Sequence, residues 1–367
     1  MSLRGEPVVL NIGPQHPSTH GVFRLRVVFD GEVVQDLEPV FGYLHRGTEK
    51  LAEERAYTQV ITLTDRLDYV SSMTNNQAYV LAVEKLANIQ PTERGMYLRV
   101  IAAELSRIAS HLVATGFFLQ DLGAFATPLM YCFRERERVL DLTEMLCGAR
   151  ITFSYMRPGG VFQDAPEEFW PAIKQFLAEM PHYLDELEQL LTENEVILAR
   201  TKGVGVLPAQ VAINASVSGP VLRASGVKWD IRKVDPYEVY DRFEFEIPIG
   251  ANGDCYDRMM VRLYEMRQSL RILEQAVRQM PRGPVRSKVP FFLRPPPGDA
   301  YAHVESPKGE LGFYLVSDGG IAPYRCKIRS PSFINLTPLR ELLRGWKMAD
   351  LIVIFGSIDI NMGEVDR

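Results

Sequence analysis

Residues 11–21 concentrate side chains that can move protons. They read Asn-Ile-Gly-Pro-Gln-His-Pro-Ser-Thr-His-Gly, and Pro14 and Pro17 prevent a regular helix, so we expect a shaped loop. Histidine titrates at about pH 6.5 and can donate a proton to a reduced carbonyl at physiological pH. His16 and His20 are therefore candidate proton-handling groups, although the residue types alone favour hydrogen-bonded turn histidines.

The same loop is a poor metal site. Pro17 breaks the helical spacing of a metal-binding histidine pair, and no cysteine or carboxylate nearby completes a ligand set. The cysteines form no C-x-x-C pair, so we expect reduced thiols in the core: Cys132, Cys147, Cys255 and Cys326. No glycine-rich turn has the context of a dinucleotide-binding or P-loop motif, and no G-x-S-x-G occurs. These patterns disfavour metal binding, direct NAD or ATP binding and a serine nucleophile.

Three further charged segments have ordinary structural explanations. In Tyr43–Lys50, Arg46 precedes a glycine that can end a loop, and Thr48 can cap the helix that follows. Residues 134–138 (Arg-Glu-Arg-Glu-Arg) are a mixed-sign run on a predicted helix, and residues 157–160 (Arg-Pro-Gly-Gly) are a turn signal that begins with a cation. We expect the last two segments to be surface features.

β structure is predicted at both ends of the chain. Val8–Ile12 and Val22–Val40 have strand character, and an Asp-Gly pair at residues 30–31 suits a tight hairpin turn within the second segment. Leu311–Ser317 and Pro323–Ile328 predict a second hairpin, joined by an Asp-Gly-Gly turn. The proline-rich residues 283–297 precede it as a linker or a loop that follows a partner surface.

Helices dominate from about Thr48 onward. The clearest follows Pro91, where apolar residues recur at spacings of three and four: Leu98, Ile101, Ala102, Leu105, Ile108, Ala109, Leu112 and Val113. The opposite side of this helix predicts a solvated or partner-facing polar stripe of Arg99, Glu104, Arg107 and His111. Further helices are expected at Phe133–Leu146, Pro166–Leu191 with an interruption at Pro181, and Asp254–Gln279.

Composition places the chain among globular proteins. Apolar residues make up 46% of its 367 residues and charged residues 24%. The 46 acidic residues outnumber the 41 basic ones and give a net charge of −5, so the basic excess of a nucleic-acid-binding protein is missing. No run approaches the roughly 18 apolar residues of a membrane-spanning helix, and we see no secretory signal. We expect an α+β protein that is soluble and cytoplasmic when taken alone.

Eight motifs, spread in order along the chain from residue 8 to Arg367, resemble one family: GPQHPSTHG, GYLHRGTEKLAEER, TDRLDY, RPGGV, RASGVKWDIRK, GDCYDRM, YLVSDGG and GEVDR. This is the family of D, or 49 kDa-type, quinone-site subunits of NADH–quinone oxidoreductase, respiratory complex I. The resemblance implies the fold of the large subunit of nickel–iron hydrogenases, with a helical-bundle core and β-hairpins near both termini. We expect three regions packed as one unit: an N-terminal β region with the quinone-site loop at 1–45, a helical core at 46–282 and a proline-rich connection with a β-hairpin and helices at 283–367.

The hydrogenase metal centre requires two pairs of cysteines, and this chain has neither pair. The corresponding segments read HRGTEK and SIDINMGEVDR. The resemblance therefore implies that the chain binds no metal and no cofactor of its own. It also implies a cavity that forms the inner end of a quinone chamber, facing the terminal 4Fe–4S cluster of a neighbouring B subunit, with ubiquinone or menaquinone as the substrate.

The resemblance assigns roles to five residues. His20 and Tyr69 would hydrogen-bond a quinone carbonyl as proton donors, and Asp121 would pair with His20 and favour its charged form. Arg46 and Arg157 would lie near the partner's cluster without being its ligands, since a cation favours the more negative reduced state.

Thr152 departs from the pattern of several relatives, which have a histidine at this position. Threonine does not titrate, so we expect the potential of the cluster to depend less on pH. Such a cluster would suit a low-potential quinone such as menaquinone.

The resemblance also implies partners. It predicts contacts with the B, C and I subunits and the membrane H subunit of a proton-pumping complex, on the cytoplasmic side of the cell membrane, and none with nucleic acid. A related complex fed by ferredoxin or another donor stays open, because the electron-input module lies elsewhere. A metal-free hydrogenase-like scaffold is a further alternative, and a hydrogenase large subunit is the least favoured one.

Overall fold

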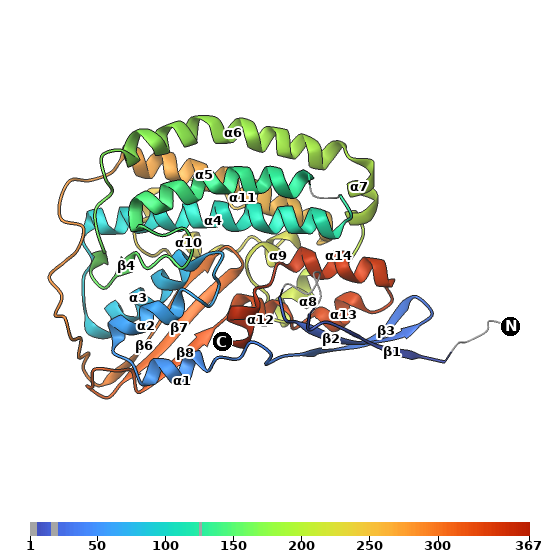
Figure 1. The fold of residues 1–367 in the computed structure, drawn as a ribbon, viewed down its shortest axis with the longest axis horizontal. Helices are drawn as coiled ribbons and strands as arrows, with labels where there is room; N and C mark the ends of the chain where they lie inside the picture. Colours follow the sequence, from blue (N-terminus) through green and yellow to red (C-terminus); the bar gives the residue numbers. More distant parts are fainter. Residues whose placement is uncertain (1–5, 16–20, 125–126) are drawn as a thin grey trace.

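The computed structural model describes residues 6–15, 21–124 and 127–367. Four long helices lie side by side above a three-stranded sheet, and a second three-stranded sheet extends to one side (Figure 1). This arrangement confirms the α+β class, with a helical core and β elements near both ends of the chain. The three-part division at residues 45 and 283 stays a prediction.

The helical layer consists of α4 (Glu93–Asp121), α5 (Thr127–Cys147), α6 (Phe169–Glu193) and α11 (Cys255–Arg278). Two of these helices begin at side-chain caps: the Thr92 hydroxyl accepts from the amide of Gly95, and the Asp254 carboxylate accepts from the amide of Asp257. The predicted interruption at Pro181 is wrong, because α6 continues through this residue. Its apolar face packs on α5 and α11, and this packing holds the helix together around the missing N–H.

Shorter helices connect these elements. They are α1 (Thr48–Glu53), α2 (Tyr57–Thr64), α3 (Ser72–Ala87), α7 (Glu195–Thr201), α8 (Ala209–Asn214), α9 (Gly219–Ala224), α10 (Ile231–Val234), a 3₁₀ turn (Tyr240–Arg242), α12 (Pro331–Asn335), α13 (Leu339–Leu343), α14 (Met348–Ile358) and α15 (Met362–Asp366). The predicted cap of α1 is wrong by one residue. Thr48 is the first helical residue, and Gly47 takes the cap position with a left-handed φ of 64° that suits glycine.

The strands form antiparallel sheets. β1 (Val8–Ile12), β2 (Arg24–Asp30) and β3 (Val33–Val40) pair in the order β1-β2-β3, which confirms the first predicted hairpin. β7 (Gly309–Ser317) and β8 (Arg325–Arg329) confirm the second hairpin. Sequence reasoning missed β6 (Gly298–Ser306), which pairs with β7 and packs on α3, and the two-residue strands β4 (Met156–Arg157) and β5 (Gly160–Val161).

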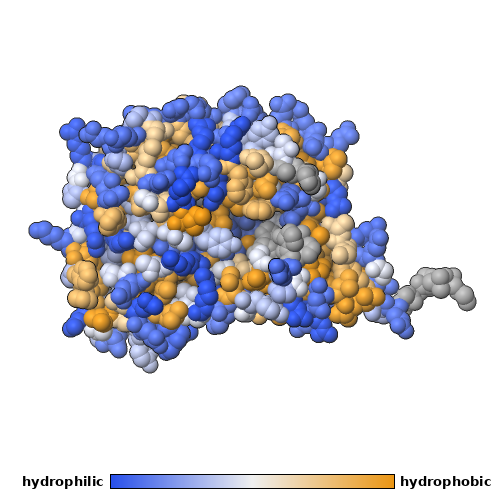
Figure 2. All heavy atoms as spheres, in the orientation of Figure 1, coloured by the Kyte–Doolittle hydropathy of each residue, from blue (hydrophilic) through white to orange (hydrophobic). Residues whose placement is uncertain are grey.

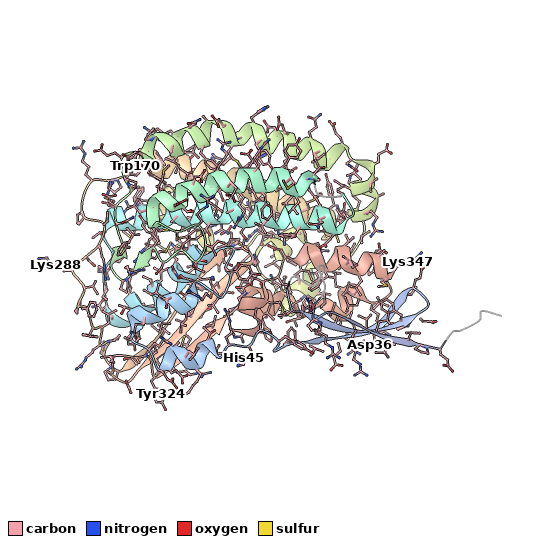
Figure 3. All side chains as sticks on the ribbon, in the orientation of Figure 1. Asp36, His45, Trp170, Lys288, Tyr324 and Lys347 are labelled. Atoms are coloured by element: carbon pink, nitrogen blue, oxygen red, sulfur yellow. The ribbon has the colours of Figure 1, made fainter. Side chains whose placement is uncertain are left out.

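The C-terminal segment closes the molecule. α14 packs against α4 and α11, and the residues before it join the N-terminal sheet through a bridge between Val33 and Lys347. Asp36 on β3, labelled in Figure 3, pairs with Arg340 at 2.6 Å. Hydrophobic and hydrophilic residues are intermixed over the visible surface (Figure 2). Among the described residues, no helix has both the length and the apolar character needed to cross a bilayer.

The polar stripe on α4 is buried, so the predicted solvated or partner-facing stripe is wrong. Arg99, Glu104, Arg107 and His111 are all inaccessible to solvent. Their partners come from distant parts of the chain: Arg99 pairs with Glu84 and Glu238, Arg232 pairs with Glu104, and Glu265 contacts His111. A helical wheel of α4 cannot reveal these partners, because they lie on α3, α10 and α11 and in the segment that follows α10.

Arg223 is the centre of this buried network. Its guanidinium lies 2.6 Å from Glu265, 2.8 Å from Glu305 and 3.8 Å from Asp230. Burial alone would raise the pKa of Glu265, but Arg223 and His111 outweigh it and hold the pKa well below its ordinary value. The network thus contains ionised groups in a dry core.

The cysteines are free, and Cys132, Cys255 and Cys326 are buried, as predicted. Burial raises the pKa of the Cys132 thiol to about 11, so this thiol is protonated at neutral pH. Cys147 is half-buried rather than in the core.

Removing the central arginine should destabilise the chain strongly. Arg223→Met leaves three buried carboxylates without their shared cation, so we expect a loss of about 3–5 kcal/mol in the free energy of unfolding. Arg271→Met removes an exposed arginine that lies 3.8 Å from Glu246, and should change stability by less than about 0.5 kcal/mol. Urea unfolding of the purified chain measures both, and equal effects of the two variants would contradict the role given to the network.

Candidate functional site

A cavity of about 280 Å³ lies where α4, α14 and the tip of the β6–β7 hairpin meet. Five separate parts of the chain line it: Gly21; Tyr69 and Val70; Val113, Ala114, Phe117 and Asp121; Lys308; and Asp359, Ile360 and Asn361. Tyr69 and Asp121, predicted as site residues from separate motifs, therefore line one cavity. His20 lies outside the described residues.

Tyr69 presents its phenol to this cavity and is 46% exposed. Burial of the ring raises the pKa of Tyr69, Asp68 raises it further, and Lys308 and Asn361 lower it. The phenol therefore keeps its proton at neutral pH and can donate a hydrogen bond to an oxygen atom in the cavity.

Asp121 is the last residue of α4 and is half-buried. Burial raises its pKa to about 7, so charged and neutral forms coexist near neutral pH. Gly356 on α14 makes this position possible, because a Cβ at residue 356 would come within 2.7 Å of a carboxylate oxygen of Asp121. A carboxyl group with this pKa can give and take a proton at physiological pH.

The floor of the cavity is ionic. The Lys308 ammonium lies 3.2 Å from Asp68, 3.5 Å from Asp359 and 3.3 Å from the hydroxyl of Ser110. The Asn361 amide donates to the other carboxylate oxygen of Asp68 at 3.0 Å. These side chains are nearly inaccessible to solvent, so their charges act in a medium of low polarity.

Sequence reasoning missed this floor. Lys308 stands in Ser-Pro-Lys-Gly, a pattern typical of an exposed hairpin turn, and nothing nearby in the sequence indicates that it is buried. Asp68 and Asn361 belong to motifs that carry the resemblance, TDRLDY and the segment before GEVDR. A role for them could have been suspected from their neighbour Tyr69.

Arg46 and Arg157 do not line the cavity. Arg46 donates to the carbonyl oxygens of Arg66 (2.7 Å) and Gly363 (2.9 Å), and burial lowers its pKa, as does the nearby charge of Arg66. Arg157 donates to the carbonyl oxygen of Met156 at 2.8 Å. Arg46 therefore contacts the segment that leads to Tyr69, whereas Arg157 donates to its own neighbour in the chain.

Asp65 lies close to Arg157 and is buried. Burial raises the pKa of Asp65 to about 7, against the opposing effects of Asn76, Arg66 and Arg157. Burial also lowers the pKa of Arg157, and Asp65 opposes this. Among the described residues, no group of three or more His, Cys, Asp or Glu side chains is arranged to hold a metal ion.

Comparison with known proteins gives consistent matches. Residues 121–295 and 292–367 match the family described as respiratory-chain NADH dehydrogenase, 49 kDa subunit. The chain is 62% identical to the D subunit of the NADH-quinone oxidoreductase of Dehalococcoides mccartyi and 57% identical to the D 1 subunit of that of Roseiflexus sp., over the full length of each pair. It is 52% identical to the D subunit of the Bacillus mycoides enzyme, over 99% of this chain and all of the relative.

The raised pKa of Asp121 predicts how stability depends on pH. The carboxyl has a pKa of about 7 in the folded chain and about 4 when unfolded. The folded chain therefore binds more protons between these values, and stability falls as pH rises from about 4 to 7. Asp121→Asn removes this contribution to the pH dependence. Between pH 5 and 8, the melting temperature of the variant should therefore fall by roughly 2 °C less than that of the wild type.

Thermal unfolding followed by circular dichroism measures this difference. Asp241→Asn, which changes an exposed aspartate, is the matched control and should follow the wild type. Identical pH dependence in Asp121→Asn and the wild type would show that Asp121 does not titrate near neutrality.

Proposed function

The chain belongs to the family of 49 kDa subunits of respiratory-chain NADH dehydrogenase, and from this premise we propose that its cavity is where a quinone is reduced. As a member of this family, the chain is part of an NADH–quinone oxidoreductase and has the α+β fold of hydrogenase large subunits. The finer proposal is that the cavity forms the inner end of a quinone chamber, completed by a B subunit that carries a terminal 4Fe–4S cluster.

One observation carries this proposal: a phenol and a carboxyl group line the same largely apolar cavity. Val70, Val113, Ala114, Phe117 and Ile360 supply apolar wall, Tyr69 and Asp121 supply polar groups on the walls, and Lys308, Asp359 and Asn361 supply those of the floor. A quinone head group has a flat apolar ring and two carbonyl oxygens, so it needs this combination. Ubiquinone and menaquinone both have it.

The reaction needs two electrons and two protons for each quinone. In our proposal the electrons come one at a time from the partner's 4Fe–4S cluster, and each carbonyl oxygen gains one proton. The O–H bond of Tyr69 breaks as a bond forms to one oxygen, while His20 and Asp121 together supply the second proton. Solvent protons then restore the donors. Proton transfer to oxygen removes the charge that electrons alone would leave in an apolar site.

We further propose that Arg46 and Arg157 face the partner's cluster. Both guanidinium groups bond to backbone carbonyl oxygens, and within the described part of the chain neither forms an ion pair closer than 4 Å. Their positive charge is therefore available to a negative neighbour. A reduced cluster is such a neighbour, since each electron adds a negative charge.

The remaining proposals concern the whole complex. We propose contacts with the B, C, I and membrane H subunits, a peripheral position on the cytoplasmic side of the membrane, and coupling of quinone reduction to proton pumping. A complex fed by ferredoxin or another donor is the alternative within the family. A scaffold without catalysis is the alternative outside it, and the shared cavity of Tyr69 and Asp121 favours the catalytic role.

Removing the phenol of Tyr69 should slow quinone reduction. Tyr69→Phe keeps the ring and loses the donor, so we expect a fall of roughly 100-fold in quinone turnover. The matched control is Tyr324→Phe, at a tyrosine that is 69% exposed and outside the cavity lining. Turnover is measured in membranes after assembly is checked, with reduction of the cluster followed in parallel.

The proposal requires turnover to fall in Tyr69→Phe while the cluster still becomes reduced. Unchanged turnover in an assembled complex would overturn it and favour the scaffold. His20→Ala, measured in the same way, tests the second donor.

Thr152 offers a test of the cluster's surroundings. Its backbone has a φ of 54°, which histidine tolerates better than a β-branched residue. Thr152→His should make the midpoint potential of the partner's cluster fall by up to about 59 mV per pH unit near the pKa of the imidazole. Thr152→Asn, which suits the same backbone but does not titrate, should keep the weak pH dependence expected of the wild type. Redox titration followed by electron paramagnetic resonance measures all three, and a steep slope in the wild type would contradict the expectation.

A further inference from the structure

We propose that Lys308 is a positioning residue for quinone reduction, whose buried ammonium acts through Tyr69 by stabilising the negative charge that develops when this phenol gives up its proton. The inference rests on the proposed function of the cavity. It adds a residue that lies at the end of a β-hairpin and belongs to none of the motifs quoted above.

The location of Lys308 is unusual for a lysine. Strands β6 and β7 pair from Gly298 and Ser317 down to Ser306 and Gly309, so Pro307 and Lys308 form a two-residue turn. Such a turn normally lies in solvent, but here Lys308 is only 4% exposed. The hairpin inserts its tip into the core and carries one positive charge to the floor of the cavity.

Several contacts hold this tip in place. The Asn335 amide donates to the carbonyl oxygen of Lys308 at 3.0 Å, and the Ser306 hydroxyl donates to that of Gly309 at 2.8 Å. Gly309 has a φ of 134°, and a Cβ there would come within 2.5 Å of the Ser218 hydroxyl oxygen. The neighbours Asn335 and Ser218 and the hydrogen bond within the turn fix the position of the ammonium, and an electrostatic role requires such a fixed position.

The charged groups around Lys308 come from four places in the chain. Asp68 precedes Tyr69, Asp359 follows α14, Arg262 on α11 lies 3.8 Å from Asp359, and Glu364 lies on α15. The hydroxyl of Ser110 on α4 completes the surroundings. Burial and Asp68 raise the pKa of Glu364 to about 8, so it is largely neutral at pH 7. The two aspartates then balance Lys308 and Arg262 while Tyr69 is protonated.

Reduction of the quinone disturbs this balance of charges around Lys308. When the Tyr69 proton moves to a quinone oxygen, a phenolate is left beside the negative charge of Asp68. Asp68 raises the pKa of Tyr69 and Lys308 lowers it, so Lys308 offsets the repulsion at the moment when charge appears. Pairing with carboxylates alone gives no reason for a buried lysine, because apolar replacement of a whole buried ion pair is often neutral or stabilising. A positive charge that stabilises the phenolate during proton transfer would explain why a lysine is buried here.

The test separates charge from packing. Lys308→Met removes the charge at similar length, Lys308→Arg keeps a charge, and Lys308→Met combined with Asp359→Asn removes one charge of each sign so that the floor stays balanced. Lys85→Met, at an exposed lysine outside the cavity, is the control. We would measure kcat and KM of each assembled membrane complex with two probes, decylubiquinone and 2,3-dimethyl-1,4-naphthoquinone.

We expect Lys308→Met to lower kcat by roughly 10–100-fold and to change KM by less than about threefold, because the quinone that binds is neutral and the charge develops later. Lys308→Arg should recover most of kcat, and the double variant should stay slow although its fold is balanced. A kcat within about threefold of the wild type in Lys308→Met, or its recovery in the double variant, would overturn the inference.

Tyr69→Phe, measured in the same series, keeps the two proposals apart. Slow turnover in Tyr69→Phe with normal turnover in Lys308→Met removes only the role of Lys308. Normal turnover in both variants removes the quinone site itself.

Discussion

Buried charge that must be paired is the constraint on which this structure depends. α4 carries arginine, glutamate and histidine side chains into a dry core, where an unpaired charge would cost several kcal/mol. Most find a partner on an element distant in sequence, such as Arg232 on α10 or Glu265 on α11, while Arg107 pairs with Glu104 on α4 itself. The helices and the β6–β8 sheet are therefore held in one arrangement by ionic contacts as well as by apolar packing. Replacing one member alone leaves the others unpaired.

The same constraint builds the cavity. The ionic floor of Lys308, Asp68 and Asp359 ties the hairpin tip, the segment before α3 and the end of α14 to one another. Tyr69, next to Asp68, is thereby placed at the cavity wall, and the end of α4 brings Asp121 to the same cavity. Gly356 completes the arrangement by leaving room for the Asp121 carboxylate beside α14. The positions of Tyr69 and Asp121 thus depend on how the core pairs its buried charges.

Patterns within short stretches of sequence predicted the helices and strands whose formation depends on neighbouring residues. Apolar spacing identified α4 and α11, and an Asp-Gly pair identified the hairpin of β2 and β3. Motif resemblance identified Tyr69 and Asp121, which share the cavity, and their roles stay predictions. The sequence could not indicate that the polar side of α4 is buried, because the charges that pair with it come from other elements. Lys308 was missed for the same reason, since a lysine at a turn is expected in solvent.

The central claim is that a quinone occupies the cavity lined by Tyr69 and Asp121. Photoaffinity labelling of the assembled membrane complex with an azidoquinone, followed by mass spectrometry of the labelled peptides, tests it directly. The account predicts labels within residues 69–70, 113–121 or 359–361 of this chain that an excess of unmodified quinone suppresses. Labels confined to other parts of the complex, or labels at these residues that unmodified quinone does not suppress, would contradict it.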